Sequence, residues 1–214
     1  MELETSKNLG GIGAILLVIG FLAIVGSAFS GILSLVGLIL VLIAMKGLSD
    51  HYGEASIFNN SLYGVILSIV GGVVTVAALF VTALSFFTNV LGIELSTVIS
   101  DPTAFSNINW TEVLVFEDLM ATVGAVLASL IVLFIFVVVA AIFYRKSLNT
   151  LASKSGVGMF STAGLLLLIG AVLTIIVIGV IVIWIALILL AVAFFRIRPT
   201  SPQPMPTTSP PPSG

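Results

Sequence analysis

The sequence predicts an all-α membrane protein, a bundle of about six transmembrane helices with both termini on the cytoplasmic side. Three observations lead to this fold class. Of the 214 residues, 59% are hydrophobic and only 7% are charged, whereas an average soluble domain carries about 25% charged residues. The apolar residues form blocks long enough to cross a bilayer. The basic residues all fall in segments that six spans would place on one side of the membrane.

The first and last apolar blocks are each too long for a single span. They run from residue 9 to 45 and from 159 to 195, which is 37 residues each. As single helices they would be roughly 55 Å long, well beyond a hydrocarbon core of about 30 Å. Each is therefore interpreted as two spans, with breaks at the small residues 26–31 and near Gly179. The predicted helices are 9–26, 30–47, 60–87, 119–144, 160–177 and 180–196.

The placement of the charges supports this count. With six spans, the N-terminus, the loops 46–58 and 145–158 and the C-terminus share one face, and a four-span arrangement would divide the basic residues between two faces. This face holds all seven of them: Lys7, Lys46, Arg145, Lys146, Lys154, Arg196 and Arg198. Because cytoplasmic loops carry the excess of Lys and Arg, we predict that this face is cytoplasmic. The six after Lys7 are expected to anchor helix ends and to reach anionic headgroups.

An alternative exists for the first helix, which could be a cleaved signal peptide. Gly26 and Ala28 form a small-residue cleavage pattern after an apolar stretch. The preceding segment carries Glu2 and Glu4 beside a lone Lys7, which is not the basic cluster that begins a signal peptide. An uncleaved first span is favoured, and the remaining topology is the same in both cases.

The segments outside the spans differ in character. The outer loop 88–118 carries only acidic charges, and Trp110 is expected to anchor short helices at the membrane interface. Within this loop, Asn109-Trp110-Thr111 is an acceptor pattern that makes Asn109 a candidate for glycosylation. The membrane domain is assigned to 1–198. The last sixteen residues, 199–214, hold seven of the eight prolines and are predicted to form a disordered cytoplasmic tail.

The third predicted helix carries a regular pattern of small and hydroxyl residues. They recur at helical spacing as Gly64, Ser68, Gly71, Gly72, Thr75, Thr82 and Ser85. Small residues on one face let membrane helices approach closely and let hydroxyl groups bond between helices. We interpret this face as a packing surface, with Gly124 and Ala128 on the fourth helix as a second one. The alternative is the polar lining of a narrow conduit.

Enzymatic chemistry has little support in this composition. The chain contains no cysteine and one histidine, His51, which excludes disulfides, thiolate nucleophiles and histidine-rich metal sites. No acid–base pair or charged relay falls at membrane depth, where ionisable residues usually mark functional sites. The net charge of −2 gives no field that would attract nucleic acid. We therefore expect no enzyme, no cofactor and no nucleic-acid partner.

With the segments laid out, the chain resembles a family of uncharacterised archaeal multi-span membrane proteins, a domain of unknown function. The resemblance rests on the stretches 7–13, 143–147, 155–160 and 191–195 together with Ala163-Gly164. It covers most of the membrane region, whereas the outer loop and the proline-rich tail depart from it. Since the family has no established activity, the resemblance implies an archaeal source and a topology without a mechanism.

Two functional hypotheses follow from these patterns. The leading one is a non-catalytic structural or assembly component of the plasma membrane, which would associate with itself or with a membrane-complex partner in the lipid bilayer. It is motivated by the small-residue faces and by the lack of buried ionisable groups. The alternative is a facilitator or channel for a small neutral solute, lined by Thr75, Thr82 and Ser85. A continuous wettable passage would favour the second hypothesis and a dry bundle the first.

Overall fold

The computed structural model describes residues 2–22, 29–92, 95–101, 116–176 and 178–198. Within these ranges the chain forms helices and no strand, and six helices are long and apolar enough to cross a membrane. The predicted all-α class with six spans is thus confirmed, whereas the side of the membrane on which the termini lie stays a prediction. The elements are α1 (Leu3–Leu22), α2 (Phe29–Tyr52), α3 (Ala55–Ser85), the π-helical turn η2 (Phe86–Val90), α4 (Leu95–Ser100), α6 (Phe116–Ser155), α7 (Met159–Leu173), the 3-10 turn η4 (Thr174–Ile176) and α8 (Ile178–Phe195).

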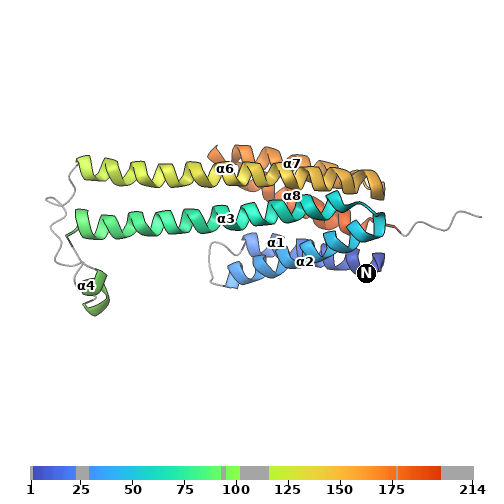
Figure 1. Cartoon of the computed structure of the whole chain (residues 1–214), viewed down its shortest axis with the longest axis horizontal. Coiled ribbons are helices and arrows are strands. Elements are labelled where there is room, and N and C mark those ends of the chain that lie inside the picture. The colour runs from blue at the N-terminus through green and yellow to red at the C-terminus, as the bar shows by residue number, and fades with distance from the viewer. Residues whose placement is uncertain (1, 23–28, 93–94, 102–115, 177, 199–214) are drawn as a thin grey trace, which may run out of the picture.

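The six long helices form a closed ring in chain order. Each packs against the next along the chain, and α8 returns to pack against α1. The ring consists of three antiparallel pairs, α1 with α2, α3 with α6, and α7 with α8 (Figure 1). We call the end that holds the turns at Gly53 and Gly156 the basal end, and the opposite end the distal end. Both glycines have positive φ, 66° and 71°, which is the usual way to terminate a helix.

The pairs differ greatly in length. The helix formed by α3 and η2 contains 36 residues and α6 contains 40, whereas the helices of the other two pairs contain between 15 and 24. At about 1.5 Å per residue, α3 with η2 is roughly 54 Å long and α8 roughly 27 Å. Figure 1 shows α3 and α6 continuing side by side beyond the distal ends of the other helices. We call this projecting part, residues 78–90 and 116–129, the distal arm.

Two predicted loops are wrong, because helices occupy most of them. The loop 46–58 is reduced to the turn around Gly53, and the loop 145–158 to the turn around Gly156. These stretches are polar on one face only. Leu48, Leu148 and Leu151 are almost fully buried in the main core cluster. The helices therefore continue past their membrane-spanning parts to bury these leucines.

The break in the last apolar block lies just before Gly179, which itself belongs to α8. The α-helix α7 ends at Leu173, and the tighter turn η4 follows, where Thr174 Oγ1 donates to the carbonyl of Ala171 at 2.6 Å. Gly179 is buried against the backbone of Gly170 and Thr174, and a Cβ atom there would overlap both. The glycine thus permits close approach of α7 and α8 and does not itself break the helix.

Candidate functional site

A cavity of about 190 Å³ lies at the centre of the ring. Residues of all six long helices line it, including Leu17 of α1, Met45 of α2, Val65 of α3, Tyr144 of α6, Leu167 of α7 and Leu187 of α8. Its lining is almost entirely aliphatic, and Tyr144 and Ser61 are its polar residues. Among the described residues, this is the place where the three helix pairs meet.

Polar side chains at the wall of this cavity bond to one another between α3 and α6. Ser147 donates from Oγ to the carbonyl of Ile57 at 2.5 Å, and its oxygen lies 2.8 Å from Oγ of Ser61. Because Ser147 uses its only hydrogen on Ile57, Ser61 must be the donor between the two serines. Ser61 and Ser147 are both buried. Two interhelical bonds thus hold the basal halves of α3 and α6 together.

A second contact joins the same helices one turn further along. The ring of Tyr144 packs on Gly64, where a side chain would collide with it. The hydroxyl group of Tyr144 lies 3.4 Å from Oγ of Ser68, and Ser68 in turn donates to the carbonyl of Gly64 at 2.9 Å. The wall hydroxyls are therefore engaged with the protein, which leaves the cavity itself apolar.

The structure divides the predicted small-residue face of α3. Gly64, Ser68 and Gly71 lie against α6, with Gly71 in contact with Phe136, and Thr75, one turn beyond Gly71, is buried. Gly72 lies elsewhere, since a Cβ atom there would meet nothing within 4 Å among the described residues.

The three hydroxyl residues proposed as a conduit lining do not share one environment. Thr75 is buried, and its hydroxyl group has no hydrogen-bond partner among the described residues. Thr82 donates to the carbonyl of Ala78 at 2.9 Å, within its own helix. Ser85 is exposed. Thr82 also lines an apolar hollow of about 280 Å³ between the arms of α3 and α6, separate from the central cavity.

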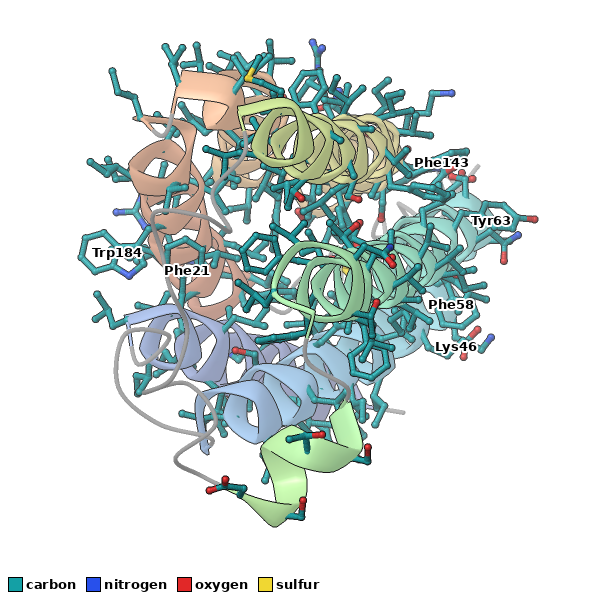
Figure 2. The ribbon with its side chains drawn as sticks, turned by 90° about the vertical axis from the view of Figure 1, so that its left-hand side faces the viewer. Phe21, Lys46, Phe58, Tyr63, Phe143 and Trp184 are labelled. Atoms are coloured by element: carbon teal, nitrogen blue, oxygen red, sulfur yellow. The ribbon has the colours of Figure 1, made fainter. Side chains whose placement is uncertain are left out.

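The basic residues gather toward the basal end, where they have different partners. Lys46 bonds to Asp50 at 2.6 Å and lies 5.5 Å from the centre of the Phe58 ring. Lys154 lies 3.4 Å from Glu54, and the hydrogen bonds from Ser56 and Lys154 lower the pKa of the Glu54 carboxyl group. In Figure 2, Lys46 and Phe58 lie on the same flank as Tyr63 and Phe143.

Arg145 and Lys146 do not stand at a helix end as predicted, because α6 continues for another ten residues to Ser155. Lys146 lies 5.6 Å from the centre of the Phe143 ring, which also contacts Tyr63 edge-on. Arg196 and Arg198 line a basal hollow of about 690 Å³ beside the turn at Gly156. Neither arginine forms an ion pair among the described residues.

Sequence reasoning missed the central cavity and the hydroxyl contacts at its wall. Ser61 continues the spacing of Gly64 and Ser68 by one turn, and Ser147 follows Tyr144 by three residues, so both lie at helical spacing from recognised positions. This helical spacing is the sequence pattern that could have predicted that Ser61 and Ser147 face the contact between the two helices. Asn109 lies outside the described residues, as does the tail 199–214, and their predicted roles are not tested.

Comparison with known proteins adds a family and a relative. The family described as "Protein of unknown function (DUF996)" matches residues 33–188. An uncharacterised protein of Methanocaldococcus jannaschii, MJ1644, is 31% identical over 197 residues, which cover 92% of this chain and 94% of that protein. No solved structure matches the chain.

Proposed function

Because the chain belongs to the DUF996 family, whose function is unknown, we propose from its geometry that it is a non-catalytic membrane component that assembles with a second copy of itself. Its six apolar helices fit a multi-pass membrane protein. The proposed location is the plasma membrane of an archaeon, with both termini in the cytoplasm. The basal position of the basic residues and the organism of the relative support this location.

The observation that carries the proposal is a small-residue face on α6 that no described part of the chain covers. Gly124 and Ala128 are exposed, as are Ala121 and Ala125 beside them. A Cβ atom at Gly124 would meet nothing within 4 Å among the described residues, whereas one at Gly64 or Gly71 would collide with α6. The face on α3 is thus used inside the chain, and the face on α6 remains available to another chain.

A second copy is the partner that best suits this face. Copies inserted with the same orientation bring their α6 helices together in parallel, and small residues four apart favour close packing of parallel membrane helices. A two-fold axis would place Gly124 of one copy near Gly124 of the other, so a single self-complementary patch is sufficient.

The absence of acid–base chemistry at membrane depth supports a non-catalytic role. The apolar stretches from Leu62 to Val90 and from Leu119 to Tyr144 contain no Asp, Glu, His, Lys or Arg. The alternative role, a facilitator for a small neutral solute, has weaker support. Thr75, Thr82 and Ser85 lie in different environments and do not line one passage, and the hydroxyl group of Thr82 donates its hydrogen bond within its own helix.

Cysteine crosslinking tests the proposal directly, since the chain has no native cysteine. We expect Gly124→Cys and Ala128→Cys to form disulfide-linked dimers on mild oxidation in native membranes. Val76→Cys serves as the control, because Val76 is 68% exposed but lies on α3, just before the distal arm begins. Equal crosslinking at all three positions would indicate random collision, and crosslinking at Val76 alone would place the contact on α3. Either result contradicts the proposed contact.

The bulky variant Gly124→Leu gives a second measurement. It should shift the protein from dimer to monomer in light scattering of detergent-purified samples, with at least a tenfold weaker self-association. Gly72→Leu is the matched control, because Gly72 also faces open space but lies away from the proposed contact.

A further inference from the structure

The central cavity has a physical origin in the way the helix pairs pack. Within each pair, glycines bring the two helices close together: Gly13 against Gly37, Gly64 against Tyr144, and Gly170 against Gly179. Neighbouring pairs also meet at glycines, toward the basal end: Gly10 and Gly11 of α1 lie against Phe194 and Phe195 of α8, and Gly164 of α7 lies against Leu148 of α6. Three tight pairs arranged in a closed ring leave space at its centre.

The basal side of this space is closed by the main core. Leu48, Ile57, Leu151 and Phe194 are all fully buried, and each lies three or four residues toward the basal end from a residue that lines the cavity. Phe194 and Phe160 pack edge to face, with ring centres 5.2 Å apart. The ring of Phe194 also packs directly on the backbone of Gly10, where a side chain would collide with it. This rigid floor prevents the pairs from closing over the space.

The distal side lies close to the ends of the short helices. Leu17 is five residues from the end of α1, and Leu167 is six residues from the end of α7. These separations correspond to about 8–9 Å along a helix. The cavity therefore lies within about two helical turns of the distal ends of α1 and α7.

We propose that this cavity binds one small, uncharged, hydrocarbon-like molecule of about the size of benzene or naphthalene. Cavities of roughly 150 Å³ with an aliphatic lining stay dry and bind benzene, and this one measures about 190 Å³. The hydroxyl groups of Ser61 and Tyr144 are engaged with Ser147 and Ser68, so no charged or strongly polar ligand finds a partner there. The inference is independent of self-association, since the cavity lies in the part of the ring where all six helices pack and not in the distal arm.

The test uses fluorobenzene as the probe and ¹⁹F NMR of the full-length protein in lipid nanodiscs. We expect a saturable bound signal in the wild type and none from fluorobenzoate at the same concentration. Val65→Phe and Leu187→Phe place a ring in the cavity from two different helices, and each should weaken fluorobenzene binding at least tenfold. Val76→Phe adds the same ring on the exposed surface of α3 and should leave binding unchanged.

Two results would overturn the proposal. One is undiminished binding in a folded Val65→Phe or Leu187→Phe protein, which would place the probe elsewhere. The other is binding in detergent micelles but none in nanodiscs, because a lipid chain would then fill the cavity in a bilayer. Helical content by circular dichroism identifies variants that fold, and the use of two variants keeps the test decisive if one of them does not.

Discussion

The bonds between Ser61, Ser147 and Ile57 allow a quantitative prediction of stability. Ser61→Ala removes one interhelical bond, the one that Ser61 donates to Ser147, and leaves the bond from Ser147 to Ile57 in place. Ser147→Ala removes both. With an average of about 0.6 kcal/mol for a hydrogen bond between membrane helices, the expected losses in free energy of unfolding are about 0.6 kcal/mol for Ser61→Ala and about 1.2 kcal/mol for Ser147→Ala.

The double variant distinguishes this arrangement from two independent contacts. Once Ser147 is removed, Ser61 has no interhelical partner left to lose, so the double variant should cost about 1.2 kcal/mol, where independent effects would add to about 1.8 kcal/mol. Ser61 also lies four residues after Ile57, so its freed hydroxyl group can donate to that carbonyl and avoid burial without a partner.

The assay is reversible unfolding in mixed micelles with increasing sodium dodecyl sulfate, followed by circular dichroism. Gly72→Ala is a suitable control, since it adds a methyl group in open space on the same helix. An additive double variant, or a larger loss for Ser61→Ala than for Ser147→Ala, would refute the arrangement in which Ser147 is the shared partner of Ser61 and Ile57.

Three further predictions concern other parts of the molecule. Gly179→Ala should lower the free energy of unfolding by about 1–3 kcal/mol, as overpacking does, because its Cβ atom would overlap the backbone of Gly170 and Thr174; the same unfolding assay, with Gly72→Ala as reference, checks this. Arg196→Gln with Arg198→Gln should reduce the anionic lipid retained on purification, measured by mass spectrometry, more than Lys46→Gln does, since Lys46 already pairs with Asp50. The lowered pKa of Glu54 means that this carboxylate stabilises the fold above its ordinary pKa of 4.5, and that the stabilisation is lost as the pH falls through the lower pKa of the folded state. Between about pH 6 and pH 3, the melting temperature of Glu54→Gln should therefore fall slightly less steeply than that of the wild type. The same slope in both proteins would contradict the prediction.

The apolar blocks were sufficient to predict the number of spans but not the full length of the helices. Hydropathy records only the part of a helix that can lie in hydrocarbon. The polar ends of α2 and α6 remain helical because Leu48, Leu148 and Leu151 recur at helical spacing and bury one face in the core. That weaker periodic signal was present in the stretches 46–52 and 145–155, where the charged residues suggested loops.

The candidate sites depend on how the helices are rotated about their axes, which one sequence does not specify. The pattern of small residues predicted one packing face on this helix that includes both Gly71 and Gly72. In the structure Gly71 meets Phe136 of α6, whereas Gly72 lies in open space among the described residues. The central cavity depends on how all six helices are placed relative to one another, so no local sequence pattern predicts it. Tyr144 marked only the end of an apolar block in the sequence, whereas in the fold it lines this cavity.

The mismatch in helix length supports the proposed self-association independently of the pattern of small residues. The short pairs, with candidate membrane spans of 18 to 22 residues, suit a hydrocarbon core of about 30 Å, whereas α3 and α6 continue distally beyond them (Figure 1). Their continuation is strongly apolar, and Phe80 and Leu127 within it are 60% and 54% exposed. An apolar arm of this kind is stable only where lipid or another protein surface covers it. Within it, the uncovered positions Gly124 and Ala128 allow the closest approach of another helix. A second copy that packs there would shield the α6 side of both arms at once, which short helices of the same chain cannot do because they end below it.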